Sequence, residues 1–403
     1  MPNSTPEAER RHNPVAATQL GDHRSDGELD DMSAAGRARR LARDLVGPAA
    51  LGGRRARSDR RAHGIGAVGA GRLRGHHRAL RAQRLMPLGF YGALTQPLDP
   101  GCTSASCLNA LAQQHSDANV ITSDISPQGR VPALRHEMLD CTDAAALATV
   151  VERHHVTQVY LLAAALSATG EKHPQWAWDL NMKGLLNVLE LARTHKLERV
   201  FWPSSIAAFG PSTPKLDTPQ HTVMDPSTVY GISKQAGERW CAWYHRMHGV
   251  DVRSLRYPGL ISWKTPPGGG TTDYAVDIFH QALKSGRYTC FLQADQRLPM
   301  MYMDDAIRAT LELMEAPTEA VQERGSYNLS GCDFTPDEIA AEIRRHVAGF
   351  EIDYAPDFRQ AIAASWPCRV DDSVARQHWG WQPRFGLQAM VQDMLDKLRA
   401  AAT

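Results

Sequence analysis

Cysteine is scarce in this chain of 403 residues, and none of its seven cysteines forms a C-x-x-C pair. No Cys/His cluster has the spacing of a zinc site, so we expect no structural metal and a reducing, cytoplasmic environment. Long apolar runs are also missing. No stretch approaches the roughly 18 residues that span a bilayer, and the N-terminus has no hydrophobic signal core. We therefore expect a cytoplasmic protein with no membrane partner.

Lysine is absent from the first 171 residues, and the first lysine of the chain is Lys172. Residues 1–85 contain seventeen arginines, nine acidic residues and few large apolar side chains. Such a segment buries too little surface to offset chain entropy, so we expect a disordered extension. One alternative is a basic arm that binds nucleic acid. Another is an organellar targeting peptide, although the acidic stretch DGELDD argues against it. A third is that the segment results from translation of DNA upstream of the true start, which would then lie near Met86. We expect no nucleic-acid partner.

From residue 86 onward, apolar strand-like runs alternate with amphipathic helical stretches. The strand-like runs are NVITSDI, QVYLLAAALSA, RVFWPSSIAAFG and VDVRSLRYPG, and the helical stretches include NMKGLLNVLELARTHK and SKQAGERWCAWYHRMHG. This alternation predicts an α/β fold with a Rossmann-type doubly wound parallel sheet over residues 86–261. After residue 261 the pattern loosens into Gly/Pro loops and shorter elements. We expect a smaller substrate-binding lobe over residues 262–403, with elements that return to the Rossmann sheet.

The segment HGIGAVGAG (residues 63–71) contains G-x-G-x-x-G, the spacing of a dinucleotide phosphate turn. Such a turn needs a strand before it and an acidic residue about 20 residues later. Here the preceding RRARSDRRA cannot form a buried strand, and no acidic residue lies between Asp59 and Asp99. We interpret the match as accidental.

The acidic residue that does fit is Asp124, at the end of the strand-like run NVITSDI. One helix length earlier lies GFYGALTQPLDPGC, where we expect the phosphate turn with Gly92 and Gly101, followed by a helix from Thr103 to His115. A carboxylate at the ribose would repel a 2′-phosphate, so Asp124 favours NAD over NADP.

The segment STVYGISKQAGE places Tyr230 and Lys234 four residues apart, on one face of an expected helix. Ser204 and Ser205 precede them at the end of a strand, where ligands of open α/β sheets bind. Tyrosine titrates near pH ~10, and an adjacent ammonium favours the phenolate. Ser205, Tyr230 and Lys234 can therefore hold an alcohol and remove its proton while a hydride leaves the same carbon.

Several long segments make the sequence similar to a known family. They include FWPSSIAAFGPSTPK, YGISKQAGERWCAWYH, DVRSLRYPGLIS, PGGGTTDYAVDIFHQAL and YAPDFRQAIAASWP. On these segments the chain resembles the extended short-chain dehydrogenase/reductases, and within them the short-chain L-threonine dehydrogenases, from about Asp117 to Leu398. The resemblance implies a homodimer that oxidises the 3-hydroxyl of L-threonine with NAD, using Ser205, Tyr230 and Lys234.

The same resemblance implies which residues contact the cofactor and the substrate. The NAD-binding set would be Gly92, Gly101, Asp124, Ile125, Leu139, Asp140, Leu162, Ala163, Ala164, Tyr230, Lys234 and Leu260. The substrate-binding set would be Ser167, Ser205, Tyr230, Thr271, Thr272 and Asp273. One departure stands out, because the family's turn G-A-L-G-Q-x-G is replaced here by GALTQPLDPGC.

Two alternative functions remain open from the residues alone. A related nucleotide-sugar epimerase or dehydratase would need a larger pocket and would release no NADH. An inactive family member with an altered phosphate turn would survive as a binding protein.

Overall fold

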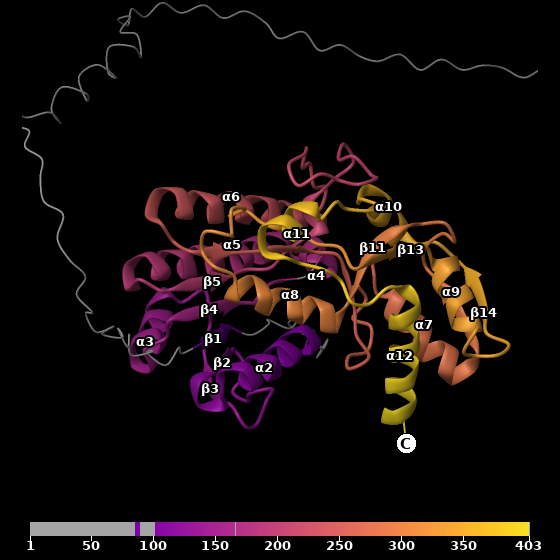
Figure 1. Ribbon diagram of the computed structural model, residues 1–403, viewed down its shortest axis with the longest axis horizontal. Coiled ribbons are helices and arrows are strands. Elements are labelled where there is room, and N and C mark those ends of the chain that lie inside the picture. Colours follow the sequence, from indigo (N-terminus) through magenta and orange to yellow (C-terminus); the bar gives the residue numbers. More distant parts are fainter. Residues whose placement is uncertain (1–84, 89–100, 166, 403) are drawn as a thin grey trace, which may run out of the picture. The chain divides into compact units, whose positions relative to one another are not determined.

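The computed structural model describes residues 85–88, 101–165 and 167–402. A six-stranded parallel sheet in the order β3-β2-β1-β4-β5-β7 forms its centre (Figure 1). The strands are β1 (Leu85–Leu88), β2 (Ile121–Asp124), β3 (Arg135–Met138), β4 (Gln158–Leu161), β5 (Arg199–Phe201) and β7 (Val252–Arg253). In such a sheet the ligand crevice opens at the carboxyl ends of the strands where the order reverses, here between β1 and β4. The expected Rossmann-type fold is confirmed.

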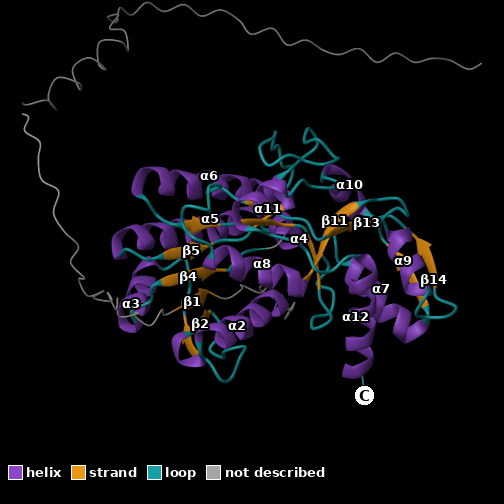
Figure 2. Ribbon diagram, in the orientation of Figure 1, coloured by secondary structure: helices purple, strands orange, loops and turns teal. Residues whose placement is uncertain are grey.

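Helices cover both faces of this sheet (Figure 2). On one face pack α3 (Ala144–His154), α5 (Pro174–His195) and α6 (Val229–His248), which share one apolar core. On the other face pack α2 (Gly101–His115), α8 (Met303–Glu315) and α11 (Ser373–Trp379). The helix expected from Thr103 to His115 is confirmed as α2.

The strand expected over RVFWPSSIAAFG is interrupted in the structure. It divides into β5, then β6 (Ser204–Ser205) and the short helix η2 (Ile206–Ala208). Pro203 lies at the break and has no N–H to donate to a ladder. β6 joins a separate parallel sheet with β8 (Leu255–Tyr257) and β12 (Tyr327–Asn328). The interruption therefore turns Ser205 out of the central sheet.

The C-terminal part is built around a third apolar core, which also includes Ile206, Ala207 and Phe209. Its strands are β9 (Gly259–Ile261), β10 (Arg287–Cys290), β11 (Leu298–Tyr302), β13 (Cys332–Phe334) and β14 (Glu351–Tyr354). Its helices are α7 (Tyr274–Ser285), α9 (Pro336–Arg344), α10 (Phe358–Ser365) and α12 (Leu387–Ala401). Because this core contains residues from both sides of position 261, the division at 261 stays a prediction.

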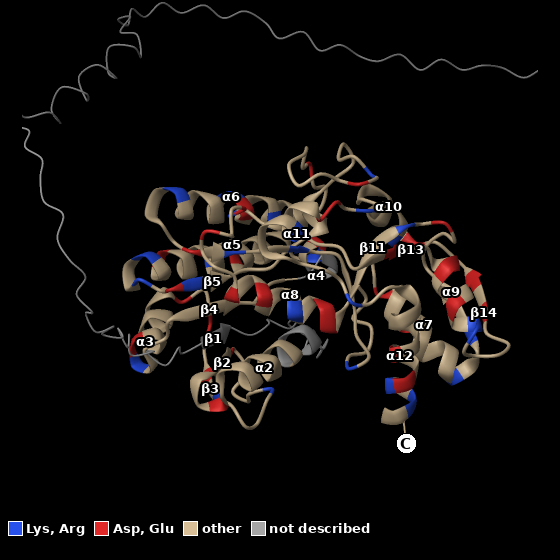
Figure 3. Cartoon of the chain, viewed as in Figure 1, with Lys and Arg blue, Asp and Glu red and all other residues tan. Residues whose placement is uncertain are grey.

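Acidic and basic side chains lie together on helices such as α8 and α12 (Figure 3). On α12, for example, Lys397 Nζ lies 3.6 Å from Asp393 Oδ2. Within the described residues, no helix combines the length and the apolar character needed to cross a membrane. The same residues contain no His/Cys/Asp/Glu group suited to hold a metal ion.

Candidate functional site

Tyr230 stands in the first turn of α6, and local contacts fix that turn. The Thr228 hydroxyl accepts a hydrogen bond from the Gly231 backbone N–H (3.0 Å) and caps the helix. A Cβ on Gly231 would lie 2.1 Å from the Ala207 carbonyl oxygen, so only glycine lets α6 approach η2 this closely. The start of α6 is thereby held against the segment that carries Ser205.

Ser205 and Tyr230 meet through their side chains. Burial raises the pKa of the Tyr230 phenol to about 12, and the neighbouring Ser205 hydroxyl acts in the opposite direction and lowers it. The Ser205 hydroxyl also accepts a hydrogen bond from Ala207 N–H (3.2 Å), which fixes its position. In the protein alone, Tyr230 is thus protonated at neutral pH and needs added positive charge to act as a base.

Lys234 lies one turn after Tyr230 on α6 and is buried. Its Nζ donates a hydrogen bond to the Pro203 carbonyl (2.6 Å) and lies 5.4 Å from the centroid of the Tyr230 ring. Burial lowers the pKa of Lys234 to about 7, opposed by smaller contributions from Cys241 and Glu238. The structure therefore brings the three predicted catalytic residues together.

Asn181 on α5 also belongs to this cluster, although the sequence reasoning did not identify it. Its side chain accepts a hydrogen bond from Ala165 N–H (2.7 Å) and donates to the Ser233 hydroxyl (3.0 Å). Ser233 in turn donates to the Tyr230 carbonyl (2.7 Å). The available signal was a polar residue at a buried position of an amphipathic helix.

The expected ribose contact, Asp124, is the last residue of β2 and is buried. Its Oδ1 accepts a hydrogen bond from Ser126 N–H (3.0 Å). Its buried Oδ2 accepts none from the described residues, although Arg130 Nε lies 3.6 Å away. A buried carboxylate oxygen with free acceptor capacity at this edge fits a ribose hydroxyl.

The other predicted cofactor residues follow the strands of the same edge. Leu139 and Asp140 come directly after β3, and Leu139 N–H donates to the Asp124 carbonyl (2.8 Å). Leu162, Ala163 and Ala164 come directly after β4 and are buried, whereas Ile125 is exposed. Leu260 lies in β9, paired with Met301 of β11.

Part of the predicted site cannot be placed. Gly92 lies outside the described residues, whereas Gly101 is the first residue of α2. The segment HGIGAVGAG, interpreted above as an accidental match, also lies outside them. Ser167 is the first residue of α4 (Ser167–Lys172), which immediately follows the β4 edge.

The loop PPGGGTTDY leads into α7 and packs near β9. The Thr272 side chain lies against Gly259, where an added Cβ would be 2.8 Å from Thr272 Cγ2. Thr271 is buried. The Asp273 carboxylate accepts hydrogen bonds from Gly268 N–H (2.7 Å) and Gly270 N–H (2.8 Å). Asp273 thus stabilises its own glycine loop, a contact that the sequence reasoning did not foresee.

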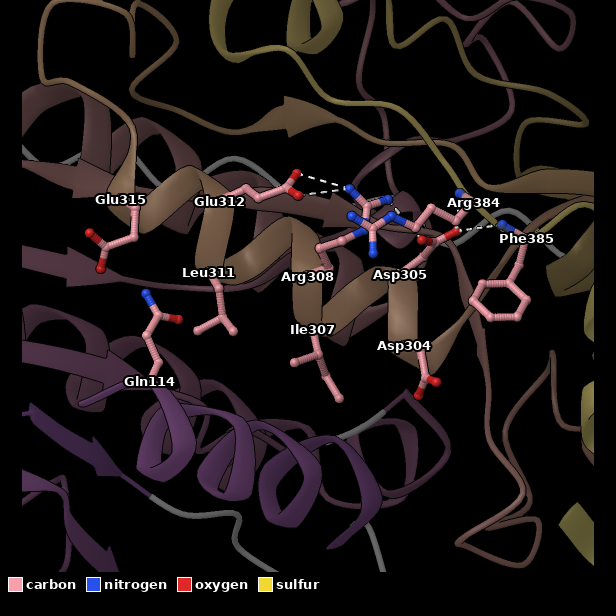
Figure 4. Close-up of a pocket in the computed structure, with 10 residues that line it drawn as sticks. All are labelled: Gln114, Asp304, Asp305, Ile307, Arg308, Leu311, Glu312, Glu315, Arg384 and Phe385. Carbon is pink, nitrogen blue, oxygen red and sulfur yellow. Dashed lines mark hydrogen bonds and ion pairs between the residues drawn. The ribbon is translucent and has the colours of Figure 1, made fainter. Parts of the chain in front are cut away.

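A surface hollow of about 740 Å³ lies along α8 and faces α2 (Figure 4). Its lining consists of Gln114, Asp304, Asp305, Ile307, Arg308, Leu311, Glu312, Glu315, Arg384 and Phe385. Arg308 donates to both Asp305 and Glu312 (each 2.8 Å), so the central charges are matched within the protein. None of the lining residues belongs to the predicted site.

A doubly wound sheet, a buried acidic residue after β2 and a Ser-Tyr-Lys cluster define a short-chain dehydrogenase/reductase type of enzyme. Residues 101–330 match the NAD dependent epimerase/dehydratase family, and the chain belongs to that family. Its cofactor is accordingly NAD, as expected from Asp124.

Individual relatives agree with this assignment. An uncharacterised epimerase/dehydratase of Staphylococcus haemolyticus is 49% identical over 288 residues, which are 70% of this chain and 89% of that protein. The structure resembles a GalE-like L-threonine dehydrogenase from Cupriavidus necator at 65% identity and a TM-score of 0.75, covering 78% of this chain and 99% of the other. It also resembles a monomeric L-threonine 3-dehydrogenase from a metagenome at 42% identity and a TM-score of 0.74, covering 79% and 100%. The family resemblance noted from the sequence is thereby confirmed.

Proposed function

We propose that this chain oxidises L-threonine at its 3-hydroxyl with NAD, yielding 2-amino-3-oxobutanoate. The observation that carries the proposal is the grouping of Ser205, Tyr230 and Lys234, in which Ser205 lowers the pKa of the Tyr230 phenol and Lys234 Nζ lies 5.4 Å from the centroid of the Tyr230 ring. The similarity to L-threonine dehydrogenases supports the choice of substrate.

In this reaction Tyr230 removes the hydroxyl proton while Ser205 holds the substrate oxygen in line with the phenol. Bound NAD supplies the acceptor for the hydride that leaves C3 of threonine. Burial raises the pKa of Tyr230 to about 12, so the phenol needs nearby positive charge. The Lys234 ammonium supplies part of that charge. The hydrogen bond from Lys234 Nζ to the Pro203 carbonyl oxygen (2.6 Å) fixes the position of the ammonium.

The cofactor would lie along the carboxyl edge of the sheet. Asp124 would accept the adenosine ribose hydroxyls through its free Oδ2, and Ile125 would lie beside it. Leu139 and Asp140 would contact the adenine. On the nicotinamide side, the contacts would come from Leu162, Ala163, Ala164, Tyr230, Lys234 and Leu260. Gly92 and Gly101 would contribute to the phosphate turn.

The substrate side combines two segments. Ser167 follows the β4 edge, and Thr271 and Thr272 follow the glycine loop near β9. We assign Asp273 to this set through the loop that its carboxylate holds together. A loop stabilised in this way would place the hydroxyls of Thr271 and Thr272 over a small zwitterionic substrate.

The direct test is absorbance at the NADH band with L-threonine and NAD as the only additions. Steady NADH formation that requires both compounds supports the proposal. The same assay with a UDP-hexose separates an epimerase, which would convert the sugar without net NADH release. Absence of NADH formation, together with saturable NAD binding, would reject the threonine assignment.

We also propose that the chain forms a cytoplasmic homodimer through α6. Trp240, Trp243 and Met247 lie on one stripe of this helix and are 39%, 37% and 57% exposed. Exposed aromatic side chains of this size are typical of protein interfaces. Since one similar enzyme is described as monomeric, light scattering of the native chain and of Trp243→Glu decides the matter. A monomeric native chain would contradict the proposal.

The cysteines of the described residues are all free, which is consistent with a reducing compartment.

A further inference from the structure

Trp202 occupies the short connection between β5 and β6, next to the interruption at Pro203. Its side chain is 4% exposed and belongs to the apolar core shared by α3, α5 and α6. Its backbone N–H donates to the Arg253 carbonyl (3.0 Å), which fixes the residue to β7. The indole is therefore held in place from the strand side.

The face of this indole lies against the Lys234 ammonium. Lys234 Nζ is 4.6 Å from the centroid of the Trp202 ring. The same nitrogen lies 5.4 Å from the Tyr230 ring and 2.6 Å from the Pro203 carbonyl oxygen. A cation within about 6 Å of an aromatic centroid is attracted by the ring's negative face, most strongly when both groups are removed from water.

The neighbouring turn of α6 is shaped to admit the indole. Gly237 lies three residues after Lys234, and a Cβ built on it would be 2.4 Å from Trp202 Cη2 and 2.6 Å from Trp202 Cζ2. Any side chain at position 237 would push the helix and the ring apart. The approach of Lys234 to Trp202 therefore depends on a glycine on the same helix.

We propose that Trp202 is a positioning residue, whose ring face holds the Lys234 side chain in its charged form beside Tyr230. Among the described residues, the hydrogen bond of the Lys234 ammonium goes to the neutral carbonyl of Pro203, which carries no compensating charge. The titratable groups that act on Lys234 are Glu238 and Cys241, both on α6. Glu238 is already paired with Arg256 (2.8 Å), so its charge is largely neutralised. The indole thus adds a stabilisation of the ammonium to the small one that Glu238 supplies.

The test measures the pKa of Lys234 in the full chain without cofactor, by NMR of lysine labelled with ¹³C at Cε. The Lys234 signal is assigned by its loss in Lys234→Arg. Trp202→Leu is expected to lower the pKa of Lys234 by about one unit, and Trp202→Phe by less, because phenylalanine retains an aromatic face. Fluorinated tryptophans at position 202 keep the size of the ring but weaken its negative face. We expect the pKa to fall stepwise with each added fluorine, and this series decides the question even if Trp202→Leu does not fold.

Trp381→Leu is the matched control. Trp381 is also buried and carries a cation, Arg308, at 4.6 Å from its ring centroid, but it belongs to the opposite core. Its replacement should reduce stability without moving the pKa of Lys234. An unchanged or raised pKa across the fluorinated series would overturn the proposal, as would an equal shift in Trp381→Leu.

A second readout depends on the proposed function. If Lys234 acts as an ammonium in threonine oxidation, the alkaline limb of the kcat/KM profile should move to lower pH with each fluorine. Lack of threonine oxidation in the native chain would reject the proposed function but leave the pKa measurement valid. A normal rate with an unmoved alkaline limb would contradict the role of Trp202.

Discussion

Arg256 and Glu238 form a buried, two-pronged ion pair directly behind the strand that carries Ser205. Arg256 Nε and Nη2 donate to the two carboxylate oxygens at 2.9 and 2.8 Å. The Ser204 hydroxyl also donates to Glu238 (2.6 Å), and Arg256 donates to the Asn328 side chain (2.8 Å). One carboxylate thus ties α6 to β6, and its arginine ties β8 to β12.

Removing one partner of this pair should strongly destabilise the fold. Glu238→Gln leaves the Arg256 charge buried and uncompensated, which costs about 3–5 kcal/mol in comparable cases. Chemical denaturation followed by circular dichroism measures the loss. The matched control is Glu351→Gln, which breaks the exposed Arg287–Glu351 pair and should have little effect. Equal losses in both variants would contradict the importance of burial.

Replacing Tyr230 by phenylalanine should abolish turnover and leave NAD binding largely intact. The change removes the hydroxyl that exchanges the proton but keeps the ring beside Lys234. Threonine-dependent NADH formation and NAD titration by calorimetry measure the two effects separately. Substantial turnover in Tyr230→Phe would show that another group removes the proton.

Asp124→Asn should shift cofactor preference toward NADP. The mutation removes the carboxylate that repels a 2′-phosphate, while Arg130 stays close enough to pair with that phosphate. We expect the NADP-to-NAD ratio of kcat/KM to rise by at least about tenfold, equivalent to roughly 1.4 kcal/mol. Asp124→Asn with Arg130→Gln is the control and should lose most of that gain. An equal ratio in the two variants would exclude Arg130 as the phosphate partner.

Lys234 should make stability depend on pH above neutrality. Burial lowers its pKa from 10.5 to about 7 in the folded protein. Between these values the unfolded chain binds more protons than the folded chain, so the free energy of unfolding rises with pH in this window. Lys234→Met has no group that titrates at this position. The free energy of unfolding of the native chain should therefore rise relative to that of Lys234→Met between pH 7 and 9.5. Denaturation of both proteins across that range measures the difference, and a constant difference would contradict a lowered pKa.

The sequence by itself determined the features that depend on local spacing. The alternation of apolar runs predicted the doubly wound sheet, and Asp124 was placed at the end of its strand. Tyr230 and Lys234 stand four residues apart, so any helix places them on one face. These relationships follow from the residue periods of strands and helices, which do not depend on the tertiary fold.

Only the tertiary structure decided which distant groups surround those residues. Asn181 reaches Ala165 and Ser233 because α5 packs beside α6, and Trp202 reaches Lys234 because Gly237 leaves room for its ring. Asp273 bonds to its own loop because that loop folds back on itself. Such contacts depend on the path of the backbone between segments, and residue spacing does not specify that path.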